Sequence, residues 1–211
     1  MAHVPHLLLE APWDSQLVEV SPGQAAHLER VLRLREGDPV SYTDGRGTLG
    51  EGRYQAGGLV VRGGETVLER PTDLVVVVAP PDNRERARFM IEKLSELGVA
   101  EVRFLETRHG QGRPPRDDRL RAWAVAGLEQ SRGVWLMRTS AELVTLSGLH
   151  DPVAICQQGG SKEPPHARTV VIGPEGGWAP GEVPEGAMLF DLGETILRVE
   201  TAALVAAARL I

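Results

Sequence analysis

The sequence predicts an α/β protein with a β-rich N-terminal domain over residues 1–70 and an α/β domain with a mostly parallel sheet over residues 71–211. Three observations support this class. Glycines divide the first seventy residues into short segments, residues 74–79 form an uninterrupted apolar run, and strand and helix patterns alternate after that run. The chain is long enough for two small domains.

The N-terminal domain is predicted to consist mainly of short strands joined by glycine-rich turns. One helix interrupts them at about residues 23–34, with Ser21 as its N-cap and Pro22 at its first position. Apolar and β-branched residues between the glycines predict the strands, at residues 40–42, 52–54, 59–62 and 66–68.

The second domain is predicted to alternate strands with helices. Its strands are expected at residues 74–79, 102–105, 153–156, 169–172 and 188–192. Helices are expected at residues 83–97, 118–130 and 200–210. For the first of these, Asp82 and Glu85 predict a capping box, and Gly98 predicts the C-terminal stop.

Composition narrows the possible classes of protein. No apolar run is long enough for a transmembrane helix, and residues 1–10 lack the pattern of a signal peptide. The single cysteine, Cys156, cannot form an internal disulfide, and this fits a cytoplasmic protein. The histidines are scattered and Cys156 has no cysteine partner, so we expect no metal site.

A G-x-G-x-x-G match at residues 45–50 is interpreted as a hairpin turn. A dinucleotide-binding motif needs a buried strand before it and a helix after it, whereas polar residues flank this one. No P-loop or G-x-S-x-G motif is present.

Two segments near the C-terminus carry the strongest functional signal. Residues 173–177, Gly-Pro-Glu-Gly-Gly, follow a buried strand, and residues 192–202 connect another strand to the last helix. Parallel sheets bind ligands beyond the carboxyl ends of their strands. From the residues alone, a ligand loop and a plain turn are equally good readings of the first segment. In the second, Thr201 is equally a helix cap, and Arg198 with Glu200 a surface ion pair.

Both segments resemble the RsmE-type enzymes of the SPOUT class, which methylate N3 of a uridine in 16S ribosomal RNA. That family carries G-P-E-G-G with a Glu shortly after it, here residues 173–177 and Glu182, and L-G-x-x-I-L-R-x-E-T-A, here residues 192–202. Weaker matches lie at residues 27–34, 37–38, 44–45, 92–99 and 129–131.

The resemblance implies an RNA-binding PUA-like β-barrel at residues 1–70 and a trefoil-knot methyltransferase domain at residues 71–211. It also implies a homodimer that takes part in ribosome biogenesis, with S-adenosyl-L-methionine bound in the knot and ribosomal RNA or the small ribosomal subunit as partner. The matching cofactor-binding residues are Gln157, Gly159, Ile172, Gly173, Pro174, Glu175, Gly176, Gly177, Leu192, Gly193, Ile196, Leu197 and Arg198.

Methylation of uracil N3 requires loss of the N3 proton and stabilisation of negative charge on the base. We expect Arg198 to stabilise that charge and Glu200 to orient Arg198 or act as the base, with the orienting role preferred. Arginines suit contacts with phosphate, and the candidates for RNA binding are Arg30, Arg33, Arg84, Arg86, Arg108 and Arg132. A solvated surface is an equally good reading of any one of them.

The chain departs from the family pattern at His6, at residues 80–84 and at Met137. Two alternatives follow: an RNA-binding relative that has lost activity, and a SPOUT methyltransferase acting on another nucleotide. An α/β enzyme using a different nucleotide cofactor is a third alternative, disfavoured by the lack of a Rossmann or P-loop motif in its proper context. The formal net charge of −6 does not itself favour RNA, although basic residues can gather on one face.

Overall fold

The computed structural model describes residues 4–150 and 152–211, which form two compact units. The first unit contains the chain up to Arg70 together with Leu128–Leu136, and the second contains Pro71–Gly127 and Met137–Ile211. A short piece of the later chain therefore belongs with the N-terminal residues.

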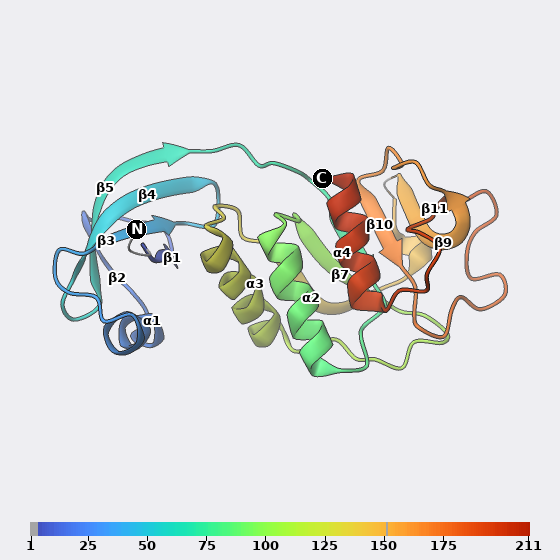
Figure 1. Ribbon diagram of the computed structural model, residues 1–211, viewed down its shortest axis with the longest axis horizontal. Coiled ribbons are helices and arrows are strands. Elements are labelled where there is room, and N and C mark those ends of the chain that lie inside the picture. Colours follow the sequence, from blue (N-terminus) through green and yellow to red (C-terminus); the bar gives the residue numbers. More distant parts are fainter. Residues whose placement is uncertain (1–3, 151) are drawn as a thin grey trace. The chain divides into compact units, whose positions relative to one another are not determined.

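The first unit is built on a curled five-stranded sheet (Figure 1). Its strands, in spatial order, are β1 (His6–Leu8), β3 (Pro39–Thr43), β4 (Thr48–Gln55), β5 (Leu59–Val67) and β2 (Leu17–Glu19). β1 pairs with β3 in parallel and the other pairs are antiparallel. Residues 44–47 connect β3 to β4, which confirms the hairpin interpretation of the glycine motif. Tyr42 and Tyr54 are the largest side chains of the core inside the curl.

The helix of the first unit begins as predicted and ends early. Ser21 caps α1 (Pro22–Ala26) in a capping box with Gln24, and a π-helical turn (His27–Val31) continues it. Arg33 has a φ of 55°, so the helix cannot extend to residue 34 as predicted. The two strands predicted at 59–62 and 66–68 form one strand, β5. β1 and β2 were not predicted, because three residues are too few to show a periodic pattern.

The second unit contains a six-stranded sheet in which every neighbouring pair is parallel. In spatial order its strands are β11 (Met188–Phe190), β9 (Val153–Ser161), β10 (Thr169–Ile172), β6 (Val75–Val78), β7 (Glu101–Leu105) and β8 (Arg138–Val144). The predicted parallel sheet is confirmed. β8 was not predicted, since it is an edge strand with no fully buried residue.

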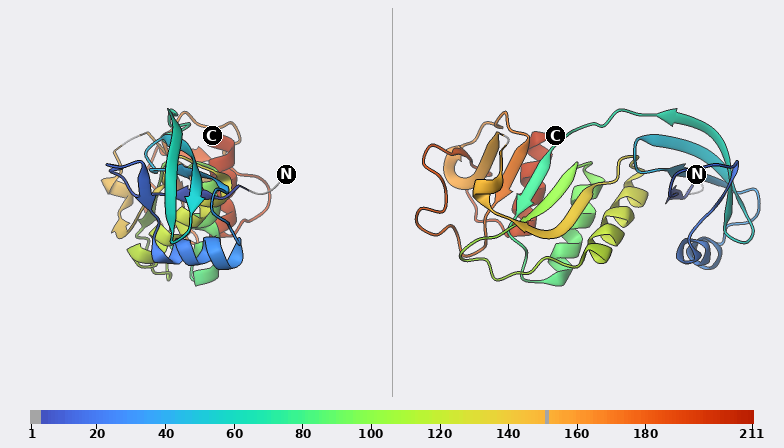
Figure 2. Two further views of the ribbon diagram at one scale, coloured as in Figure 1. Left: turned by 90° about the vertical axis from the view of Figure 1, so that its left-hand side faces the viewer. Right: turned by 180° about the vertical axis from the view of Figure 1, so that it is seen from behind.

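Three helices, α2 (Arg84–Glu96), α3 (Asp117–Ser131) and α4 (Val199–Leu210), lie along one face of this sheet (Figures 1 and 2). The opposite face is covered by loop residues and a short 3₁₀ helix (Leu146–Gly148), which pack against Val77 and Val171. Burial on both faces explains why the β6 sequence is apolar without alternation. None of the helices in the described part of the chain is long and apolar enough to cross a membrane.

The N-terminus of α2 differs from the prediction by one residue. Asn83, not Asp82, is the N-cap, and its side-chain oxygen accepts hydrogen bonds from the backbone N–H groups of Glu85 and Arg86. The amide oxygen of Asn83 therefore satisfies two helix N–H groups that would otherwise lack partners. Gly98 follows the helix with a φ of +82°, as expected of a C-terminal stop.

We predict that Asn83→Ala lowers the free energy of unfolding by about 1 kcal/mol, the usual cost of losing an N-cap. Asp82→Ala is the matched control, because Asp82 contributes only an exposed ion pair with Arg86 at 3.4 Å and should cost a few tenths of a kcal/mol at most. Urea denaturation of the two variants measures the difference. Equal losses would show that the cap does not reside in Asn83.

Candidate functional site

The site is a cavity at the carboxyl ends of β9, β10 and β11. The pairing register places Ile172, the last residue of β10, beside Cys156 of β9. β11 pairs with β9 on its other side, and the register jumps from Ile155 to Ser161, so residues 156–160 bulge out of the ladder. The loops that leave three neighbouring strands are thus gathered at one edge of the sheet.

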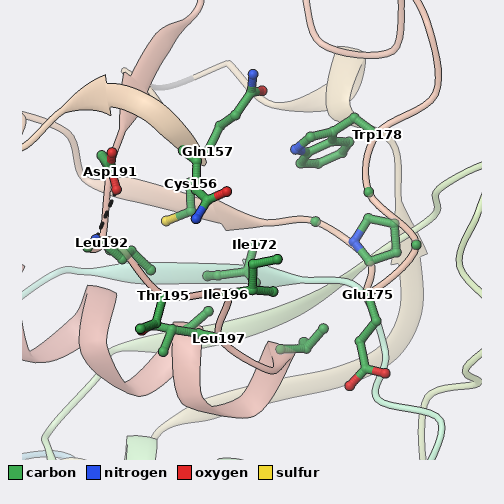
Figure 3. A pocket seen from close by; sticks show the side chains of 18 residues that line it. Cys156, Gln157, Ile172, Glu175, Trp178, Asp191, Leu192, Thr195, Ile196 and Leu197 are labelled. Carbon is green, nitrogen blue, oxygen red and sulfur yellow. Dashed lines mark hydrogen bonds between the residues drawn. The ribbon is translucent and has the colours of Figure 1, made fainter.

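The cavity has a volume of about 400 Å³, a size suited to a small-molecule ligand. It brings together both family-like segments, and Figure 3 shows their side chains around it. Its lining residues are Cys156, Gln157, Gln158, Ile172, Gly173, Pro174, Glu175, Gly176, Gly177, Trp178, Asp191, Leu192, Gly193, Thr195, Ile196, Leu197, Val199 and Ala202.

Two of the residues predicted to bind the cofactor, Gly159 and Arg198, do not line the cavity. Gly159 lies in the bulge and donates its backbone N–H to the Asp191 carboxylate at 3.0 Å. Arg198 is the exposed N-cap residue of α4. Seven lining residues were not predicted: Cys156, Gln158, Trp178, Asp191, Thr195, Val199 and Ala202. All but Ala202 are immediate neighbours in the sequence of a predicted residue.

Asp191 joins two of the loops around the cavity. One carboxylate oxygen accepts the N–H of Gly193 at 2.9 Å and the other accepts the N–H of Gly159 at 3.0 Å. These two hydrogen bonds, with that from Gly193 the stronger influence, hold the pKa of Asp191 below its usual value. The charged carboxylate therefore fixes the spacing between the β9 bulge and the loop after β11.

Gly173 allows an aromatic ring to cover the end of β10. A Cβ at this position would lie 2.7 Å from the ring of Trp178, too close for any residue with a side chain. Trp178 in turn packs against the apolar face of the sheet and lines the cavity (Figure 3). The glycine thus permits an aromatic wall directly above a strand end.

Cys156 lies in the cavity wall without nucleophilic character. Burial raises the pKa of its thiol to about 12, so the thiol stays neutral at physiological pH. Within residues 4–150 and 152–211, no three His, Cys, Asp or Glu side chains are grouped as ligands for a metal.

Arg86 connects residues 173–177, the glycine-rich loop, to the last helix, α4. Its guanidinium lies 3.0 Å from a carboxylate oxygen of Glu175 and 3.7 Å from one of Glu200. Glu200 is buried, and its other oxygen, Oε2, has no hydrogen-bond partner among the described residues. The structure thus pairs Glu200 with Arg86, whereas the sequence suggested Arg198 as its partner.

Glu182 anchors a further loop to the same region. Its carboxylate accepts hydrogen bonds from the backbone N–H groups of Ala179 at 2.8 Å and Arg108 at 2.9 Å. Burial alone would raise the pKa of Glu182, but these two hydrogen bonds outweigh burial and lower it. His109 follows Arg108 in the chain, and its Nδ1 lies 3.1 Å from the carbonyl oxygen of Gly177. The loop after β7 is thereby fixed against the loop after β10.

The predicted RNA-binding arginines fall into two groups. In the first unit, Arg30 and Arg33 are exposed, and Arg132 donates a hydrogen bond to the carbonyl oxygen of Val4. In the second unit, Arg84 and Arg108 are exposed, whereas the guanidinium of Arg86 is engaged by carboxylates.

Two departures from the family pattern have structural explanations. His6 is buried in the first unit, where Nε2 donates to the carbonyl oxygen of Gly133 at 2.9 Å and Nδ1 shares a hydrogen bond with Ser41 Oγ. Burial lowers the pKa of His6, which favours the neutral imidazole. Met137 is buried in the second unit. Both residues serve the cores of their units.

We predict that Asp191→Asn lowers the melting temperature at neutral pH, because an amide has only one acceptor oxygen and no charge, so it cannot accept both backbone N–H groups as the carboxylate does. The folded-state pKa of Asp191 is lowered, so its contribution is present above the ordinary carboxyl pKa of about 4 and is lost as the pH falls through the folded-state value. Thermal melts from neutral to acidic pH should show the difference from wild type shrinking. Glu194→Gln, which changes an exposed carboxylate, is the control and should leave the melting temperature unchanged. A difference independent of pH would contradict the role given to Asp191.

Comparison with known proteins agrees with this geometry. The chain is 28% identical to ribosomal RNA small subunit methyltransferase E of Synechocystis over 92% of its length and 72% of that protein. A probable rRNA-methyltransferase from Porphyromonas gingivalis superposes with a TM-score of 0.83 and 27% identity, covering 97% of this chain and 96% of that one. Ribosomal RNA small subunit methyltransferase E from Neisseria gonorrhoeae, solved with S-adenosyl methionine, superposes with a TM-score of 0.79 and 24% identity, covering 98% and 96%. The model of the RNA methyltransferase domain matches residues 68–211, which is more than half of the sequence. The chain belongs to the RNA methyltransferase domain family.

Proposed function

We propose that this protein transfers the methyl group of S-adenosyl-L-methionine to N3 of a uridine in the 16S RNA of the small ribosomal subunit. One observation carries the proposal: residues 173–177, 192–193 and 195–197, from the segments with the strongest resemblance to RsmE-type enzymes, line a single cavity at the strand ends. The rRNA methyltransferases with the same fold support the choice of reaction.

The cavity suits the adenosyl part of the methyl donor. Apolar side chains such as Ile172, Leu192 and Leu197 offer surfaces for a flat ring, while backbone groups at the strand ends can bind its polar edge. Ile196 lines the cavity and yet is 90% exposed. A ligand that covers this exposed apolar side chain removes it from water, and this burial favours binding.

Chemistry at uracil N3 requires that negative charge on the base be stabilised. Arg198 is our candidate for this role. It caps α4 immediately after Leu197, which lines the cavity, and it is exposed, as a residue that meets an incoming RNA base must be. Glu200 is a positioning residue, acting through Arg86 on Glu175 in the glycine-rich loop.

Partners and location follow from the substrate. Exposed arginines, chiefly Arg30, Arg33, Arg84 and Arg108, are candidates for contacts with RNA phosphates. We further propose that the protein works as a homodimer in the cytoplasm, where ribosomal subunits are assembled, and that its C-terminal unit has the knotted threading of SPOUT enzymes.

Mass-spectrometric mapping of 16S RNA tests the proposed function directly. A strain lacking the gene should lose one methyluridine, and the purified protein with S-adenosyl-L-methionine should restore it on subunits from that strain. Loss of a different modified nucleotide would favour the alternative of another target. Binding of RNA without binding of the methyl donor in calorimetry would favour an inactive relative.

We predict that Ile196→Ser weakens binding of S-adenosyl-L-methionine about tenfold, since it removes an apolar side chain that the ligand would bury. Val67→Ser is the matched control, because Val67 is 78% exposed and lies in β5 of the first unit. Titration calorimetry of both variants gives the two affinities. Equal affinities would contradict the placement of the adenosyl group against Ile196.

We predict that Arg198→Ala reduces the rate of methylation about a hundredfold, as the loss of a charge-stabilising group does in other enzymes. The affinity for the methyl donor should change little, because Arg198 does not line the cavity. Arg168→Ala is a suitable control, since Arg168 is an exposed arginine before the amino end of β10 and pairs with Asp73. A near-normal rate for Arg198→Ala would remove Arg198 from the mechanism.

A further inference from the structure

A second cavity, of about 230 Å³, adjoins the first. Residues 80–82 after β6, residues 109–112 after β7 and residues 174–176 after β10 surround it, together with Val199 at the start of α4. Residues 174–176 and Val199 line both cavities. A ligand in the second cavity would therefore lie beside a methyl donor in the first, across the glycine-rich loop.

The second cavity has the size and chemistry for a single small ring. The rings of Pro80 and Pro81 and the side chain of Val199 provide apolar surface, and His109 and Gln111 provide polar groups. A uracil base presents two carbonyl oxygens and one N–H at its edge, so it needs both donors and an acceptor around it. Neither of these polar residues has a part in the first cavity.

The loop that carries His109 is held on two sides. Arg108 donates its backbone N–H to Glu182 at 2.9 Å, which ties the loop to the segment after β10. At Gly112 the backbone passes so close to Pro80 that an added Cβ would lie 2.0 Å from its carbonyl oxygen. Only glycine fits there, and the contact joins the loop to the segment after β6. The wall that contains His109 is thus fixed in place before any ligand arrives.

The hydrogen bond of His109 determines which ring nitrogen can accept a proton. The Gly177 carbonyl oxygen, 3.1 Å from Nδ1, can only accept, so Nδ1 carries the hydrogen. Nε2 is then left with the free lone pair, as in histidines whose tautomer is set by a backbone carbonyl. Histidine is the side chain most often used as a general base.

We propose that the second cavity receives the target uracil and that Nε2 of His109 removes its N3 proton. The N3–H bond breaks with transfer of the proton to Nε2. The electron pair on N3 then forms the bond to the methyl carbon as the carbon–sulfur bond breaks, which leaves S-adenosylhomocysteine as a neutral thioether. The imidazolium afterwards releases its proton to water. This inference rests on the proposed uridine methylation and adds the acceptor site and its base.

The charged groups around His109 are compatible with this step. Glu182 accepts the N–H of the neighbouring Arg108, while Asp82 and Glu175 line the same cavity and both pair with Arg86. Arg86, which pairs with both of these carboxylates, and Arg108 are the basic groups in this region.

Single-turnover methylation of small subunits from the gene-deletion strain, with labelled S-adenosyl-L-methionine and excess protein, tests the role of His109. His109→Ala and His109→Gln should each lower the rate about a hundredfold at neutral pH, a typical loss for a general base. Their affinity for the methyl donor should stay within about twofold of wild type, since His109 does not line the first cavity. His150→Ala, at an exposed histidine outside both cavities, should have no effect.

The pH dependence separates a base from a merely structural residue. Alkaline solution ionises uracil N3 without a catalyst, so the deficit of both His109 variants should shrink as the pH rises. A rate near wild type in either variant that binds the methyl donor normally, or a deficit unchanged by pH, would overturn the inference while leaving uridine methylation intact. Failure of the wild-type protein to methylate the RNA would instead refute the proposed function, and this inference with it.

Discussion

The parallel pairing of β10 between β9 and β6 is the constraint on which the rest of the structure depends. Its register aligns Ile172 with Cys156 on one side and with Val78 on the other, so three strands end at the same edge of the sheet. Because parallel strands all run in the same direction, every loop that leaves their carboxyl ends begins at that edge. Both cavities are built from these loops.

Loops gathered in this way have no ladder of their own, and carboxylates hold them instead. Asp191 binds two backbone N–H groups around the first cavity, and Glu182 binds two more beside the second. A charged acceptor forms stronger hydrogen bonds than a neutral one, so a few side chains can fix several loops. Arg86 adds an ionic link between the glycine-rich loop and α4. The spacing between the cavities thus depends on a small set of polar contacts.

These contacts also bear on the formal charge of −6, which by itself argues against an RNA-binding protein. Several of the acidic residues are used internally: Asp191 and Glu182 bind backbone N–H groups, and Glu101 pairs with Arg103 and Arg138. Arginines such as Arg30, Arg33 and Arg84 remain exposed. The count of charges over the whole chain is therefore a poor guide to what an RNA would meet at the surface.

The sequence alone was sufficient for the fold class, for most strands and helices of the second unit and for the two segments of the first cavity. Uninterrupted apolar runs such as residues 74–79 and the glycine-rich segment at 173–177 are local patterns, and local patterns can be recognised in the sequence without knowledge of the fold. The tertiary structure decided what depends on distant partners. It grouped residues 128–136 with the N-terminal unit, paired Glu200 with Arg86 rather than Arg198, and brought His109 beside Gly177. The Glu200–Arg86 pair joins residues 114 positions apart, and the contact between His109 and Gly177 joins residues 68 positions apart. Strand pairing, and not proximity along the chain, determines which loops meet.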